Sequence, residues 1–260
     1  MQNALIAGLI IASICGMVSV LVVLRRTAFA SHALGHMSLT GAAAAALLGI
    51  STIIGQLSLN LVATIIMGLM GDKIKKNDLV VGVVLTFILG CGTYFLFLFQ
   101  NNYAGGVMSI LFGNILAISV TQIKLLIVLA GIILFILIIF ARPLIFASID
   151  PVVAAAKNIS LRTLAIVFFI VLAITVSMAC QIVGVLLVFT LLIIPGAIGI
   201  QWADRIYSII LISIFVANLA VTSSLYIAYY FNLPVSFCIT MLLTVIYCVG
   251  LLKQATVRII

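Results

Sequence analysis

The sequence predicts an all-α, polytopic membrane protein with about nine transmembrane helices, and three observations carry this prediction. Hydrophobic residues make up 67% of the 260 residues, and charged residues only 6%. The mean hydropathy is +1.53, far above that of a soluble domain. Long Leu, Ile and Val runs without alternating polar residues are typical of membrane-spanning helices and argue against an outer-membrane barrel. We therefore expect a single transmembrane domain over residues 1–260, embedded in a lipid bilayer.

A length of about 20 apolar residues per span divides the chain into nine expected helices. The first span follows no basic residue, so we expect it to be retained rather than cleaved as a signal peptide. Residues 104–121 form a short, glycine-bearing stretch, which we expect to be re-entrant or interfacial and not to cross. The nine expected helices lie near 4–24, 30–50, 52–70, 79–99, 123–141, 161–180, 182–200, 206–228 and 234–252.

Basic residues fall almost entirely on one side of this arrangement. They follow the first, third, fifth, seventh and ninth spans, and only Lys124 lies on the other side. By the positive-inside rule, the N-terminus then lies outside and the C-terminus in the cytoplasm. The net charge of +8 marks the cytoplasmic face, so we expect no nucleic-acid partner.

The second span holds the only two histidines of the chain, His32 and His36. Side chains at i and i+4 project from one helix face, so two imidazole nitrogens could converge on one metal ion. A hydrogen bond to a neighbouring helix is the alternative for an intramembrane histidine. A zinc protease helix would carry a glutamate after the first histidine, and Ala33 stands there, so we expect no catalysis.

Two further features concern the third and seventh spans. Gln56, Asn60 and Thr64 form one polar stripe, which either hydrogen-bonds neighbouring helices or lines a wetted pathway. Pro195 and Gly196 interrupt the seventh span, and a proline inside a helix usually produces a kink.

The loop after the fifth span predicts a short cytoplasmic helix over about 150–158. Asp150 suits an N-cap, Pro151 the first helical position, and Asn158 the left-handed residue that ends a helix. Such a helix is either a simple connection or a docking surface for a motor protein. The chain has no G-x-x-x-x-G-K-[ST] phosphate loop, so ATP-driven transport would need another subunit.

All four aspartates fall in the expected cytoplasmic loops. Proton-coupled carriers commonly use buried carboxylates, so this placement disfavours an ATPase-independent secondary carrier, which we keep as an alternative.

Taken together and in order, these blocks resemble the membrane permease of bacterial ABC importers for zinc, manganese and iron ions. The resemblance implies a homodimer in the cytoplasmic (inner) membrane, supplied by an extracytoplasmic metal-binding protein. It also implies that a cytoplasmic ATP-binding subunit contacts the loop with Asp150, Pro151, Ala154 and Asn158. The blocks that carry it are residues 29–41, 111–117, 150–158, 183–187, 191–195 and 233–234.

The sequence departs from the family pattern at His32 and Asn158, and the change at His32 concerns the metal. His36 matches the family's histidine, whereas His32 stands where the family usually has an aspartate; Asn158 replaces a common glycine. Nitrogen in place of a carboxylate oxygen suits Zn²⁺ better than Mn²⁺. We therefore expect zinc as the transported substrate, with manganese, ferrous iron or a metal chelate as alternatives, and no permanently bound cofactor.

Overall fold

The computed structural model describes residues 2–70, 77–98, 113 and 118–259, and within them the chain is an α-helical bundle without strands. This confirms the predicted fold class. The helices are α1 (Gln2–Leu24), α2 (Ala28–Leu47), α3 (Thr52–Met70), α4 (Asn77–Leu98), α6 (Val120–Ile149), α7 (Pro151–Ala156), α8 (Leu161–Val183), α9 (Val185–Trp202), α10 (Ile206–Phe231) and α11 (Val235–Ile259).

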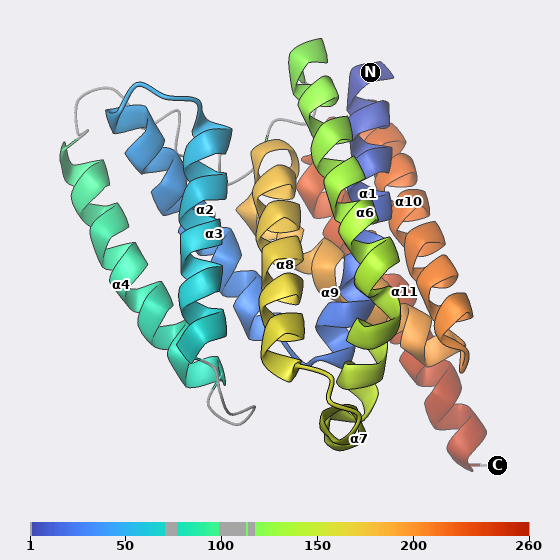
Figure 1. Cartoon of the computed structure of the whole chain (residues 1–260). Helices are drawn as coiled ribbons and strands as arrows, with labels where there is room; N and C mark the ends of the chain where they lie inside the picture. Colours follow the sequence, from blue (N-terminus) through green and yellow to red (C-terminus); the bar gives the residue numbers. More distant parts are fainter. Residues whose placement is uncertain (1, 71–76, 99–112, 114–117, 260) are drawn as a thin grey trace.

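Nine long helices of the described residues run up and down the bundle, as the sequence predicts (Figure 1). Eight of them are long and apolar enough to cross a membrane, and α2 is the ninth. The two histidines and the neighbouring Ser, Gly and Thr residues lower the hydropathy of α2, but it packs lengthwise against α3 and α4. The two termini lie at opposite ends of the bundle, as an odd number of crossings requires.

The connection between α4 and α6 makes no net crossing. Helix α4 ends and α6 begins at the same end of the bundle (Figure 1), which agrees with the expected non-crossing segment. Most of 104–121, Asn114 included, lies outside the described residues. The segment ends earlier than expected, because Ser119 and Gln122 form a capping box that starts α6 at Val120.

Two proline-containing helices are longer or more regular than the sequence suggests. The fifth span was expected to end at residue 141, but α6 continues through Pro143 to Ile149. Helix α9 continues through Pro195, whose carbonyl oxygen accepts a hydrogen bond from Ser213 Oγ of α10 at 2.7 Å. Neighbouring helices thus supply contacts that tolerate proline inside a membrane helix.

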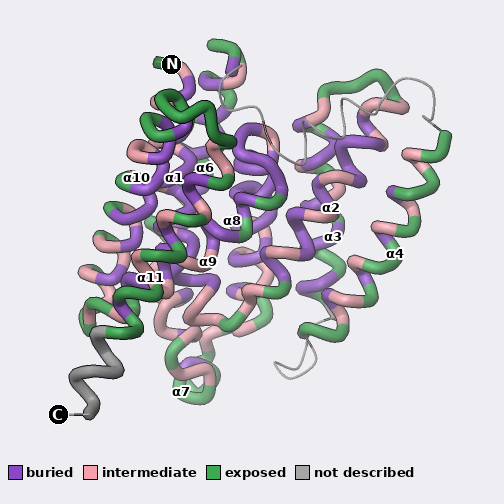
Figure 2. The backbone as a smooth tube through the Cα atoms, turned by 180° about the vertical axis from the view of Figure 1, so that it is seen from behind, coloured by how far each residue is buried: buried purple, intermediate pink, exposed green. Residues whose placement is uncertain are grey.

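The protein core lies between α1, α8 and α9. Every residue from 171 to 180 of α8 is buried, whereas α4 and α11 are the least buried of the spanning helices. Figure 2 shows this pattern as buried backbone in the centre and exposed backbone on the outer helices. The outer apolar faces are those that lipid or another subunit can cover.

Candidate metal-translocation site

The two histidine rings lie next to each other on α2. Their ring centroids are 4.6 Å apart with an interplanar angle of 82°, so the one-turn spacing brings both imidazoles to one place. A third ring comes from α9, where Phe189 lies 4.8 Å from His32, centroid to centroid. Sequence reasoning missed Phe189, because it lies more than 150 residues further along the chain and carries no local signal.

The histidine pair lies at the edge of the protomer rather than in its core. Both rings are half-buried, while the α2 residues around them, Ala33, Leu34 and Met37, are fully buried. Phe189 is 37% exposed. Within the described residues, no group of three or more His, Cys, Asp or Glu side chains could hold a metal. One protomer therefore offers two nitrogen ligands at a surface that remains open.

Close packing fixes α2 against its neighbours. Gly41 of α2 and Gly55 of α3 approach so closely that a Cβ on either would collide with the backbone of the other helix. On the α4 side, Thr40 Oγ1 donates to Ile88 O at 3.3 Å and contacts Gly92. Small residues permit such close helix contact in a membrane. The histidine pair is thus carried by a rigidly held helix.

The amide stripe of α3 lies in the protein interior. Gln56, Asn60 and Thr64 each have an exposed fraction of 0%. Asn60 Nδ2 donates to Ser38 Oγ of α2 at 2.7 Å and to Ser177 Oγ of α8 at 2.8 Å. Asn60 therefore joins three helices, which is the interhelical role that the sequence left open.

Gln56, one turn away from Asn60, makes no hydrogen bond to a neighbouring helix within the described residues. Neither Gln56 Oε1 nor Gln56 Nε2 has a hydrogen-bond partner among the described residues, and the same holds for Asn60 Oδ1. Buried polar atoms without a partner are rare in native proteins and cost free energy. In this conformation the stripe does not border an open passage.

The predicted short helix is present as α7. Asp150 Oδ1 accepts hydrogen bonds from the backbone amides of Val152 at 3.1 Å and Val153 at 3.0 Å, and Pro151 occupies the first turn. Asn158 has φ +57°, the left-handed conformation that the sequence predicts. The helix is shorter than 150–158, since it ends at Ala156.

Helix α7 presents one apolar face outward. Ala154 is fully buried against the bundle, while Val152 is 77% exposed. The helix lies at the end of the bundle that also carries the C-terminus (Figure 1). It is available to a partner on that side.

Gly113 is the one described residue of the 99–117 region. Its φ of +71° is the left-handed conformation that favours glycine, and a Cβ would collide with the backbone of Val183 and Gly184. The resemblance block at 111–117 therefore contacts the junction between α8 and α9 at this residue. The rest of that block lies outside the described residues.

Comparison with known proteins places this architecture in a family. The family model described as "ABC 3 transport family" matches residues 1–254 of this chain. The manganese import system permease protein ScaB of Streptococcus parasanguinis is 28% identical over 251 residues, which cover 96% of this chain and 89% of ScaB. The manganese transport system membrane protein MntC of Halalkalibacterium halodurans is 30% identical over 209 residues, covering 79% and 70% of the two chains.

A solved structure shows the same fold. The chain matches the structure of PsaBC from Streptococcus pneumoniae in complex with Fab with a TM-score of 0.84 and 27% identity. The match covers 96% of this chain and 90% of that one. The helical bundle, the capped α7 and the family match agree with one another. The chain therefore belongs to the ABC 3 transport family, as a multi-pass permease subunit of a metal-importing ABC transporter that works with ATPase and substrate-binding partners, and not as an enzyme.

Proposed function

We propose that this chain is the permease of an ATP-driven manganese importer in the bacterial cytoplasmic membrane, and that two copies hold the passing ion at His32 and His36. The observation that carries the proposal is the adjacent pair of imidazole rings on α2, which are open on one side. Two nitrogen ligands are too few to hold an ion securely. A two-fold axis beside α2 would bring a second pair to the same ion.

We propose manganese rather than zinc as the transported ion for two reasons. The relatives ScaB and MntC are named for manganese, which favours what the sequence analysis gave as an alternative. The second reason is chemical. Mn²⁺ binds nitrogen ligands less tightly than Zn²⁺ does, and a transport site has to release its ion. His32 in place of the family's aspartate leaves zinc as the main competitor.

The α7 helix is the proposed contact with the ATPase subunit. Its N-cap bonds to Asp150 hold it in one conformation, and Val152 projects from it. A rigid helix transmits a push from a partner better than a flexible loop does. We propose that Asp150, Pro151, Ala154 and Asn158 together form this coupling element.

The orientation in the membrane follows from the basic residues. Arg142, Lys157 and Arg205 lie near the end of the bundle that carries α7 and the C-terminus. We propose that this end is cytoplasmic and that the N-terminus lies outside, in accord with the positive-inside rule.

Transport in vesicles tests the proposal. The chain is co-expressed with its ATPase and binding protein, and ATP-dependent uptake of Mn²⁺, Zn²⁺, Fe²⁺ and a metal chelate is measured in competition. We expect Mn²⁺ to be preferred and to stimulate ATP turnover. His32→Ala and His36→Ala should each nearly abolish uptake while the complex still assembles.

A matched control is Leu39→Ala, because Leu39 is the next half-buried residue of α2 after the pair. It should keep most of the uptake. Unchanged Mn²⁺ uptake in both histidine variants would end the claim for the pair. Uptake without any ATPase would favour the alternative of a self-sufficient carrier, and preference for a chelate would replace the free ion as cargo.

A further inference from the structure

A groove runs along the outside of the bundle between α6 and α10, with α1 as its floor. We call it the α1/α6/α10 groove; it is lined by side chains from residues 17–21, 134–145 and 207–214 and has a volume of about 390 Å³. Helices α6 and α10 both pack on α1, and in Figure 1 the three lie side by side. The lining is apolar apart from Tyr207, and its outer rim is exposed, with Ile138 and Tyr207 each 78% accessible.

The length of the groove matches one leaflet of a bilayer. Residues 134–145 of α6 span about 16 Å at the rise of an α-helix. Half of a hydrocarbon core of about 30 Å is about 15 Å. The deep end is marked by Leu134 and Ile214, and the shallow end by Ile145 and Tyr207 at the C-terminal end of the bundle. The groove is therefore long enough for an acyl chain of that leaflet.

Two arginines lie beside the shallow half of the groove. Arg142 follows the lining residue Ala141, and Arg205 lies two residues before Tyr207; both are exposed. Neither forms an ion pair with a residue in the described ranges. Tyrosine at this depth places its hydroxyl at the headgroup level, and basic pockets between membrane helices suit anionic headgroups.

The groove lies away from the histidine pair. His32 and Phe189 lie where α2 meets α9, whereas α6 packs on α1 and α8 and lies in front of them in Figure 1. A second copy that covers the histidine face, as the proposed function requires, would meet α2 and α9, whereas the groove is lined by α1, α6 and α10. The binding argument itself does not depend on what the permease transports.

We propose that the α1/α6/α10 groove is a binding site for an anionic phospholipid. One acyl chain lies along Ile138 and Leu211, and the phosphate is held between Arg142 and Arg205 with the Tyr207 hydroxyl beside it. The lipid fills the α1/α6/α10 groove and so connects α6, which leads into α7, to α10.

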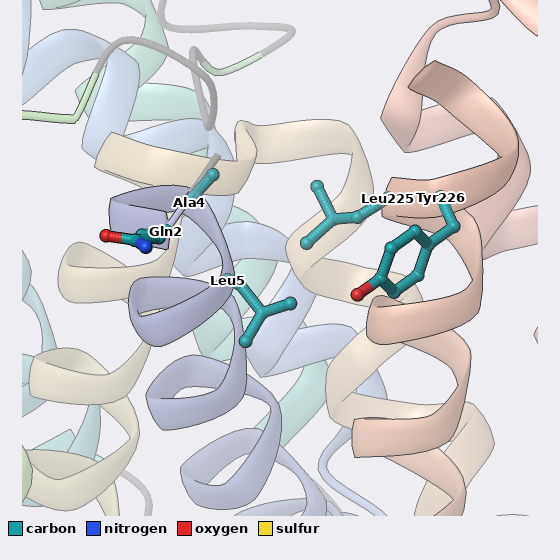
Figure 3. Close-up of a pocket in the computed structure, with 5 residues that line it drawn as sticks. All are labelled: Gln2, Ala4, Leu5, Leu225 and Tyr226. Atoms are coloured by element: carbon teal, nitrogen blue, oxygen red, sulfur yellow. The ribbon is translucent and has the colours of Figure 1, made fainter. Parts of the chain in front are cut away.

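A second crevice on the same helices provides an internal comparison. Figure 3 shows it near the start of α1, lined by Gln2, Ala4, Leu5, Leu225 and Tyr226. It lies at the opposite end of α1 and α10 and has a volume of about 190 Å³. Neither site has a lysine or arginine among its lining residues, but no lysine or arginine lies within two residues of the crevice lining in the sequence, whereas Arg142 and Arg205 do so at the groove. We therefore expect no preference for an anionic lipid at this crevice.

Native mass spectrometry of the purified full-length permease with its ATPase tests the proposal. The complex is delipidated and titrated with phosphatidylglycerol or phosphatidylcholine of identical acyl chains. Two basic residues should favour the anionic lipid by about 30-fold. The double variant Arg142→Gln/Arg205→Gln should bring this preference close to one, and Lys124→Gln, at the other end of α6, should leave it unchanged.

A second variant tests the acyl chain. Ile138→Trp places a large ring in the groove and should lower the occupancy of both lipids, while Leu5→Trp in the smaller crevice should not change the anionic preference. Equal binding of the two lipids by the wild type, or a preference that survives in the double variant, would overturn the proposal. So would efficient disulfide cross-linking between two copies through Leu211→Cys, because a second copy would then cover the groove.

Discussion

Replacing Gln56 with methionine is expected to stabilise the protein. Gln56 is fully buried on α3, and neither atom of its side-chain amide has a hydrogen-bond partner among the described residues. Methionine has a similar length and volume and no polar group, so it fills the same space without the unpaired amide. The substitution removes a cost without removing a contact.

The size of the effect follows from the burial. Leaving a buried polar group unpaired costs about 1–3 kcal/mol in proteins. Repacking around a volume-conserving substitution itself costs typically less than about 1.5 kcal/mol, and this cost is subtracted from the gain. We expect a net gain of about 1–2 kcal/mol, which in a chain of this length raises Tm by roughly 2–4 °C.

Thermal unfolding of the purified protein in detergent or nanodiscs measures this shift. Gln122→Met is the matched control, because Gln122 Oε1 accepts a hydrogen bond from Ser119 N at 2.9 Å in the capping box of α6. That variant should lose stability instead. A Gln56→Met protein with an unchanged or lower Tm would refute the reasoning, since the amide would then have to be hydrogen-bonded in the folded state.

Transport by the same variant separates the two interpretations of the polar stripe. If Gln56 serves only helix packing, Gln56→Met should be more stable and still take up Mn²⁺. A variant that is more stable but transports poorly would favour the predicted pathway role, because the amide would then be used in another conformation of the cycle.

Three further predictions concern packing, coupling and orientation. Gly55→Ala should lower Tm by several degrees, because the new Cβ would collide with α2. The control Gly90→Ala on α4 has open space for the Cβ and should leave Tm unchanged or slightly higher. Equal Tm shifts in the two variants would contradict the packing argument. Asp150→Lys should reduce co-purification of the ATPase or uncouple ATP hydrolysis from uptake. The control Asp150→Asn should keep both the N-cap of α7 and the coupling. A fully coupled Asp150→Lys complex would exclude the docking role. A cysteine in place of Val152 should react with a membrane-impermeant maleimide only after the cells are opened, whereas a cysteine in place of Asn232 should react in intact cells. The reverse pattern would invert the proposed orientation.

Local sequence signals predicted the features that neighbouring residues decide. Asp150, Pro151 and Asn158 predicted α7 and its left-handed end, because caps depend on a few consecutive residues. The spacing of His32 and His36 placed their rings together, because helix geometry alone sets which side chains share a face.

The same reasoning failed where a partner from a distant segment decides the outcome. A length of about 20 apolar residues placed the end of the fifth span at residue 141, but α6 continues through Pro143 to Ile149. The stripe on α3 appeared equally suited to packing and to a pathway, and Ser38 and Ser177 from two other helices bury Asn60 in this conformation. Neither partner lies near Asn60 in the sequence.

By itself the sequence predicted a polytopic helical protein with about nine spans, basic residues gathered at one end, and two imidazoles one turn apart. Only the tertiary structure decided that the imidazoles lie at an open edge beside Phe189, that the amides are enclosed, and that a groove remains between α6 and α10. The physical reason is the solvent. Lipid tails and protein interiors are equally apolar, so hydropathy marks which residues leave water but not which of the two they face.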